Sequence, residues 1–116
     1  MKKIDLELLE KVIVERPRHS HKGDYGRLLL LGGTYPYGGA IIMSAIAAVK
    51  IGAGLVTVGT DKENIPALHS HLPEAMAFSL KDKALLKEQL EKAEVVLIGP
   101  GLREDAFGEE LVKWVF

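Results

Sequence analysis

The sequence contains no cysteine among its 116 residues. This absence excludes a disulfide framework, a thiolate metal site and a cysteine nucleophile. Fifteen Lys and Arg residues stand against sixteen Asp and Glu residues, which leaves a formal net charge of -1 at pH 7. Such a near-neutral balance gives no overall reason to expect nucleic acid or an anionic membrane surface as a partner.

Long hydrophobic runs are also absent. The longest uncharged apolar stretch, Ala40–Val49, is interrupted by Ser44, and it is far shorter than the ~20 residues that span a bilayer. Lys2 and Lys3 resemble the start of a signal peptide, but acidic residues interrupt any apolar segment after them. We therefore expect a cytoplasmic protein. A hydrophobic fraction of 47% is normal for a globular domain, and the length allows one domain with its own core.

The hydrophobic pattern predicts strands that alternate with helices after an N-terminal helix at Asp5–Glu15. Strands are expected at Leu28–Leu31, Leu55–Val58, Ala75–Phe78 and Val95–Ile98. Helices are expected at Ala40–Ile51, near Glu63–Leu68, at Lys83–Lys92 and from about Glu104 to the end. Each strand is a continuous apolar run, so we predict an α/β fold with a parallel sheet and helices on both faces. The helix at Ala40–Ile51 is apolar almost all round, which predicts deep burial against the sheet.

Ligands of such folds bind at the carboxyl ends of the parallel strands. Three glycine-containing segments follow predicted strands: Gly32-Gly33, Gly59-Thr60 and Gly99-Pro100-Gly101. The first leads through Tyr37-Gly-Gly to a helix start, where free backbone N–H groups and the helix dipole favour an anion. The spacing matches neither Walker A nor the dinucleotide fingerprint. Two interpretations stay open: the glycines admit a ligand, or they only allow a tight turn and close packing.

Three further groups of polar residues are candidate sites. A basic cluster before the first strand could contact phosphate oxygens or could be a solvated loop; it comprises Arg16, Arg18, His19, His21, Lys22 and Arg27. Two His-x-His pairs, His19/His21 and His69/His71, could bind Zn²⁺ only on an extended backbone. We prefer ordinary polar histidines and expect no metal site. Glu104 and Asp105 are adjacent, so helix capping is favoured over a paired-carboxylate role.

Taken together, the motifs resemble the ADP/ATP-dependent NAD(P)H-hydrate dehydratases of the ribokinase-like superfamily. They occur in the family's order from Arg16 onward: His21-Lys-Gly-Asp-Tyr-Gly-Arg, Leu28-Leu-Leu-Leu-Gly-Gly, Tyr37-Gly-Gly-Ala, Ala48-Val-Lys-Ile-Gly-Ala-Gly-Leu-Val-Thr-Val, Pro73-Glu-Ala-Met and Ile98-Gly-Pro-Gly-Leu. The resemblance implies a three-layer α/β/α fold, of which this chain carries about four βα units.

The resemblance also implies a repair reaction. A nucleotide, ADP or ATP with Mg²⁺, phosphorylates the ring hydroxyl of hydrated NADH or NADPH, and loss of phosphate restores the double bond. Ala40 and Gly101 match family positions that line the hydrated-cofactor site. The same motifs include four residues expected to border that site: His21, Lys22, Gly33 and Gly39.

The family's later Gly-x-Gly-Asp motif, which supplies the catalytic base, has no counterpart here, because Gly99-Pro-Gly continues with Leu102. The nucleotide-binding segments are absent too, and Arg103 replaces a glycine common in the family. Residues 114–116 stop within an amphipathic helix. We therefore expect residues 1–116 to be an N-terminal part of a dehydratase domain, with no catalytic residue and no activity alone.

Two other functions remain open at this point. One is a ribokinase-like kinase of a small molecule, and the other is a non-catalytic nucleotide-binding module that keeps the anion-binding loops without a base. The isolated chain is also expected to leave a sheet edge uncovered and to associate, either as a homo-oligomer or with a further polypeptide segment.

Overall fold

The computed structural model describes residues 3–12 and 26–116, which contain a four-stranded sheet. The strands are β1 (Arg27–Leu31), β2 (Leu55–Thr60), β3 (Met76–Ser79) and β4 (Val95–Ile98). Their order across the sheet is β3-β2-β1-β4, and every neighbouring pair is parallel. Leu29 lies opposite Thr57 on one side and Val96 on the other. The predicted parallel sheet is therefore confirmed, with β3 beginning one residue later than expected.

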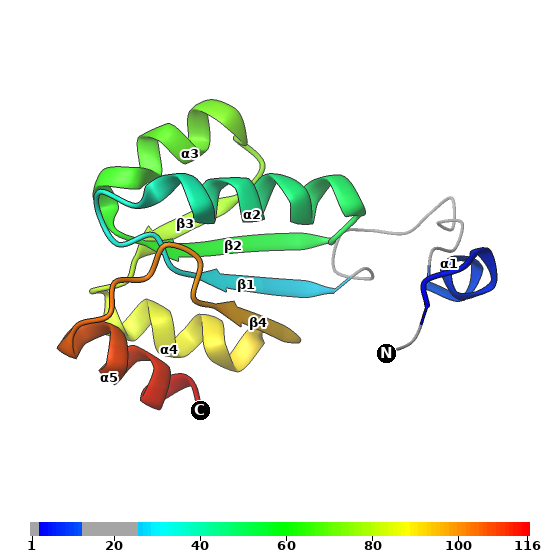
Figure 1. The fold of residues 1–116 in the computed structure, drawn as a ribbon. Coiled ribbons are helices and arrows are strands. Elements are labelled where there is room, and N and C mark those ends of the chain that lie inside the picture. Colours follow the sequence, from blue (N-terminus) through cyan, green and yellow to red (C-terminus); the bar gives the residue numbers. More distant parts are fainter. Residues whose placement is uncertain (1–2, 13–25) are drawn as a thin grey trace.

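Helices cover both faces of the sheet and give the predicted three layers (Figure 1). On one face lie α2 (Gly38–Ile51) and α3 (Ile65–His71), the latter preceded by a 3₁₀ turn, η2 (Lys62–Asn64). On the other face lie α4 (Lys83–Lys92) and α5 (Ala106–Val115). Strand β1 alternates between the two layers, because successive side chains of a strand point to opposite faces. Leu30 packs with Ile41 on the α2 side, whereas Leu29 and Leu31 pack beneath α4 and α5.

Helix α2 is less buried than its composition suggests. Ile41, Ala45 and Ala48 face the sheet and are buried, but Met43 is 67% exposed and Ile51 is 77% exposed. The prediction that this helix is buried deeply is thus wrong for its outer side, because the 3.6-residue period turns only one stripe toward the sheet. The helix ends at Gly52, whose φ of 105° makes it a left-handed C-cap.

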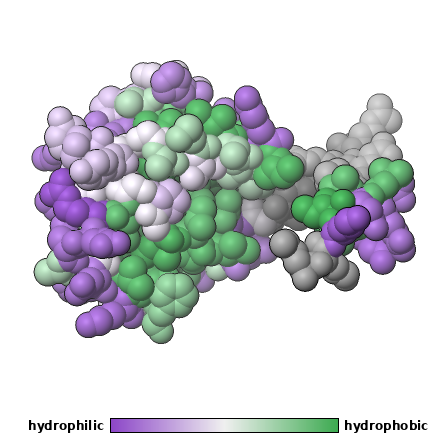
Figure 2. All heavy atoms as spheres, in the orientation of Figure 1, coloured by the Kyte–Doolittle hydropathy of each residue, from purple (hydrophilic) through white to green (hydrophobic). Residues whose placement is uncertain are grey.

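Strand β4 forms one edge of the sheet in the described residues. Val95 and Leu97 lie opposite Leu28 and Leu30, on the face covered elsewhere by α2. No helix of the described residues covers them there, and they are 60% and 43% exposed. Figure 2 shows hydrophobic side chains gathered below α2 on this side of the molecule.

Helix α1 (Leu6–Val12) lies apart from the sheet in Figure 1, and none of its residues is buried. Asp5 caps its start, because the carboxylate accepts a hydrogen bond of 2.9 Å from the Leu8 N–H. The helix was expected to continue to Glu15, and residues 13–15 lie outside the described part of the chain. None of the helices in residues 3–12 and 26–116 has the length and apolar character needed to cross a membrane.

Candidate ligand site at the carboxyl edge of the sheet

The loops that follow β1, β2 and β4 meet at one edge of the sheet, as the parallel arrangement predicts. The Gly33 N–H donates to the Pro100 carbonyl at 2.9 Å, and the Thr34 N–H donates to the Gly101 carbonyl at 2.9 Å. The Gly32 N–H donates to the Gly59 carbonyl at 3.1 Å. Backbone hydrogen bonds therefore join all three loops.

Most glycines of this edge are required by close packing. A Cβ atom at Gly32 would collide with the Pro100 carbonyl oxygen, and one at Gly38 would collide with the side chain of Asn64. Gly33 and Gly101 have φ values of +72° and +67°, a backbone region that residues with a side chain rarely adopt. At these four positions, close packing or the backbone conformation explains the glycine without a ligand.

Gly39 is different. A Cβ atom built there meets no heavy atom within 4 Å, and the residue is exposed. It lies in the first turn of α2, and the N-cap residue Tyr37 contributes no side-chain cap. The first N–H groups of a helix have no partner within the helix, so this turn offers donors to an anion beside open space. Packing in these residues does not explain the glycine at this position.

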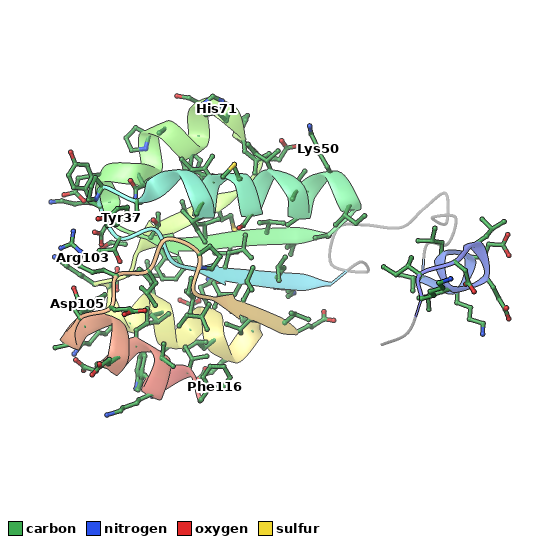
Figure 3. All side chains as sticks on the ribbon, viewed as in Figure 1. Tyr37, Lys50, His71, Arg103, Asp105 and Phe116 are labelled. Atoms are coloured by element: carbon green, nitrogen blue, oxygen red, sulfur yellow. The ribbon has the colours of Figure 1, made fainter. Side chains whose placement is uncertain are left out.

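Arg103 lies beside the same turn (Figure 3). Its backbone N–H donates to Thr34 Oγ1 at 3.1 Å, and its guanidinium donates to the Tyr35 carbonyl at 3.1 Å. The guanidinium also lies 5.9 Å from the ring centroid of Tyr37. These contacts hold the β4 loop against the loop after β1, and they place a cation at the edge where an anion would bind.

The sequence prediction placed Gly59-Thr60 at this edge but named neither of the buried polar residues Thr60 and Asn64 as a site residue. Thr60 Oγ1 donates to the Gly33 carbonyl at 2.9 Å, and Asn64 Nδ2 donates to the same oxygen at 2.6 Å. The only signal in the sequence is a threonine at the end of an apolar strand, followed four residues later by an asparagine. This pattern is common in turns and does not indicate a site.

Two carboxylates near the site have structural partners. Asp61 is at the N-cap position of η2 but makes no capping bond. Its Oδ2 instead accepts from the Tyr35 N–H at 2.8 Å. Asp105 Oδ1 accepts from the Gly108 N–H at 2.8 Å and caps α5, which confirms the capping role. The last helix therefore begins at Ala106 rather than at Glu104.

The structure brings together four of the six predicted site residues. A Cβ at Gly101 would lie 3.4 Å from the Gly33 Cα and would clash with the Tyr37 carbonyl oxygen, directly before α2. Gly39 and Ala40 occupy the first turn of that helix. His21 and Lys22, with the rest of the basic cluster up to residue 25, lie outside the described residues.

The second His-x-His pair lies on a helix rather than on an extended segment. His69 and His71 belong to α3, where residues two apart do not share a face. His69 Nε2 lies 3.0 Å from the Ala75 carbonyl oxygen. Among residues 3–12 and 26–116, no three His, Asp or Glu side chains form a group that could hold a metal ion.

Comparison with known proteins identifies the family of the chain. The sequence model of the NAD(P)H-hydrate dehydratase family matches residues 28–116. The chain is 83% identical over 116 residues to the ADP-dependent (S)-NAD(P)H-hydrate dehydratase of Streptococcus pneumoniae, covering 100% of this chain and 40% of that protein. It is 46% identical to the Enterococcus faecalis protein of the same name, covering 99% of this chain and 40% of that protein.

Solved structures give the same fold. A ribokinase-like superfamily protein from Enterococcus faecalis superimposes with a TM-score of 0.92 at 46% identity, over 97% of this chain and 39% of the other. The ADP/ATP-dependent NAD(P)H-hydrate dehydratase from Bacillus subtilis, co-crystallised with ATP and Mg²⁺, gives 0.74 at 28% identity, over 92% and 39%. The chain thus spans about two fifths of the length of these relatives. With this ribokinase-like fold and the match over residues 28–116, the chain belongs to the NAD(P)H-hydrate dehydratase family.

Proposed function

We propose that residues 1–116 are the N-terminal, substrate-binding part of a domain that dehydrates hydrated NADH or NADPH in a nucleotide-dependent reaction. The observation that carries the proposal is the combination of Gly39, which faces open space, with an α2 N-terminus that lacks a side-chain cap. Both lie in a chain that the family model matches over residues 28–116. The relatives from Streptococcus pneumoniae and Enterococcus faecalis carry this activity in their names.

We assign the substrate contacts to backbone atoms rather than to charged side chains. Gly39 and Ala40 offer N–H groups of the first turn of α2 to an anionic group of the dinucleotide. Gly33 and Gly101 form the floor beside them. A Cβ atom at Gly33 would collide with Thr60 Oγ1, and one at Gly101 would collide with the Tyr37 carbonyl oxygen. His21 and Lys22 precede β1 in the sequence and complete the proposed set.

The described residues do not fit a site for the phosphoryl donor and its Mg²⁺. No group of three or more His, Asp or Glu side chains that could hold a metal ion occurs among residues 3–12 and 26–116, and Asp105 is used to cap α5. We therefore assign ADP or ATP, Mg²⁺ and the catalytic base to a segment beyond these 116 residues, and we derive no chemical step through them. A cytoplasmic location and a homo-oligomeric state remain predictions.

A chimera tests the proposal. Residues 1–116 replace the aligned segment of the Streptococcus pneumoniae relative, and formation of NADPH from its hydrate is followed with ADP, with ATP and without nucleotide. We expect NADPH only when a nucleotide and Mg²⁺ are present. The unaltered relative serves as the control for the assay, and the isolated 116-residue chain is expected to be inactive.

Two outcomes would contradict the proposal. One is a chimera that melts cooperatively at the temperature of the relative but forms no NADPH. The other is full activity of the isolated chain, which would mean that the base lies within it. A stable phosphorylated alcohol product without turnover of the hydrate would instead favour a ribokinase-like kinase.

A further inference from the structure

The carboxyl end of β2 contains a pair of buried polar side chains, Thr60 and Asn64. They are 0% and 7% exposed, and besides them only Thr57 is both polar and buried among the described residues. Asn64 Nδ2 donates to Thr60 Oγ1 at 3.1 Å, and both side chains donate to the Gly33 carbonyl oxygen. Buried polar groups destabilise a fold unless they are hydrogen-bonded. Core packing alone therefore does not explain why two polar side chains are buried here.

Three donors converge on the Gly33 carbonyl oxygen. Besides Thr60 Oγ1 and Asn64 Nδ2, the backbone N–H of Asp61 approaches it at 3.3 Å. The same peptide unit continues into the N–H of Thr34, which donates to the Gly101 carbonyl. Because a trans peptide is planar, a fixed carbonyl also fixes the direction of this N–H. One peptide plane is therefore held between the end of β2 and the loop after β4.

Asn64 also touches the other end of the glycine loop. A Cβ at Gly38 would collide with Asn64 Oδ1 and would lie 2.7 Å from its Cγ, so the amide lies directly against the Gly38 backbone. A Cβ at Gly33 would lie 3.3 Å from Asn64 Nδ2. The side chain thus supports both Gly33, after β1, and the residue where α2 begins.

We propose that Asn64, together with Thr60, is a positioning residue that fixes the Gly33–Gly38 loop and the first turn of α2 for substrate binding. Neither side chain needs to touch the substrate, because both act through the Gly33 peptide and the Gly38 backbone. This inference rests on the proposed function for its effect on the substrate. Its structural part, the order of the loop, can be measured without any substrate.

The first experiment measures backbone hydrogen exchange in the 116-residue chain. Asn64→Asp replaces the Nδ2 donor with an oxygen that repels the Gly33 carbonyl. We expect the amides of Gly33, Thr34, Tyr35 and Tyr37 to exchange at least about tenfold faster, while the amides of α4 change little. Leu68→Ala is the matched control, because it opens a cavity in the same core without touching the loop. Equal acceleration of these loop amides in both variants would overturn the proposal.

The second experiment uses Thr60 in the chimera. Thr60→Val removes the hydroxyl at nearly constant volume, and Thr60→Ser keeps it. We expect Thr60→Val to raise KM for the hydrate by about tenfold with a smaller change in kcat, and Thr60→Ser to stay within about threefold of the parent. A variant destabilised only in the core, Leu68→Ala, should keep the parent KM.

The two experiments separate the possible failures. An inactive parent chimera would contradict the proposed function. The hydrogen-exchange experiment does not depend on activity, so it would still test the positioning role. An active chimera in which Thr60→Val and Thr60→Ser share the parent KM would contradict the positioning role.

Discussion

Gly39 provides a direct test at the level of a single residue. Its absent side chain leaves open space rather than relieving a clash. We expect Gly39→Ala to leave the free energy of unfolding unchanged or to raise it by about 0.5–1 kcal/mol, because alanine is the better helix former. The same methyl group should weaken binding of the hydrate in the chimera by about tenfold or more, since it occupies the space that the ligand needs.

Denaturant unfolding and the KM for the hydrate measure the two halves of this prediction. Ala47→Ser, an exposed substitution two turns further along α2, is the control. It should leave KM unchanged and lower the free energy of unfolding by no more than about 0.5 kcal/mol. Unchanged affinity in Gly39→Ala would mean that the ligand does not approach this turn.

Gly101 should behave in the opposite way. Its φ is +67°, and a Cβ would collide with the Tyr37 carbonyl oxygen. Gly101→Ala should therefore lower the free energy of unfolding by about 1–3 kcal/mol, from backbone strain together with the displaced loop. Chemical denaturation of the 116-residue chain measures this cost, and a variant as stable as the parent would contradict the reported packing of the two loops.

These two glycines also illustrate what a sequence can and cannot predict. The concentration of glycines after β1 and β4 indicated a special backbone, but the pattern is the same whether a glycine avoids a clash or leaves room for a ligand. The distinction needs the position of the Tyr37 carbonyl, which approaches Gly101 from a distant part of the chain. Asn64 was missed for the same reason, because its partner Gly33 lies 31 residues away.

At the level of the elements, the start of α5 depends on one of two adjacent carboxylates. Asp105 accepts from the Gly108 N–H, whereas no hydrogen bond of the Glu104 carboxylate is found in the described part of the chain. Asp105→Ala should therefore destabilise the chain by about 1 kcal/mol. Glu104→Ala is the matched control and should cost clearly less. Thermal unfolding of both variants measures the difference, and equal losses would contradict the capping role.

Element types were predictable here because local signals and tertiary packing agree. Leu28–Leu31 and Val95–Ile98 are apolar runs bounded by glycine or charge, and both became strands of the parallel sheet. Helix starts were less predictable: α5 begins two residues after the predicted Glu104, because Asp105 caps it, and α2 begins two residues before the predicted Ala40 without a side-chain cap. The outer side of α2 was mispredicted, because an apolar composition does not say which residues a neighbouring element covers.

For the whole molecule, the open edge of β4 should govern behaviour in solution. Val95 and Leu97 expose apolar area beside α2, and an unpaired strand edge invites further pairing. We expect the 116-residue chain to associate at micromolar concentrations and the double variant Val95→Lys/Leu97→Lys to be mainly monomeric. Sedimentation velocity measures this, with Ala84→Lys on the surface of α4 as the control. A monomeric parent chain would contradict the prediction.

We propose that the carboxyl edge of this sheet binds the hydrated cofactor. An NMR titration tests this binding, with residues 1–116 isotope-labelled within the chimera and the hydrate of NADPH added. We predict that the amide signals of Gly33, Gly39, Ala40 and Gly101 shift, while that of Ala84 on α4 stays in place. Saturable binding that leaves these four signals unchanged would contradict the account.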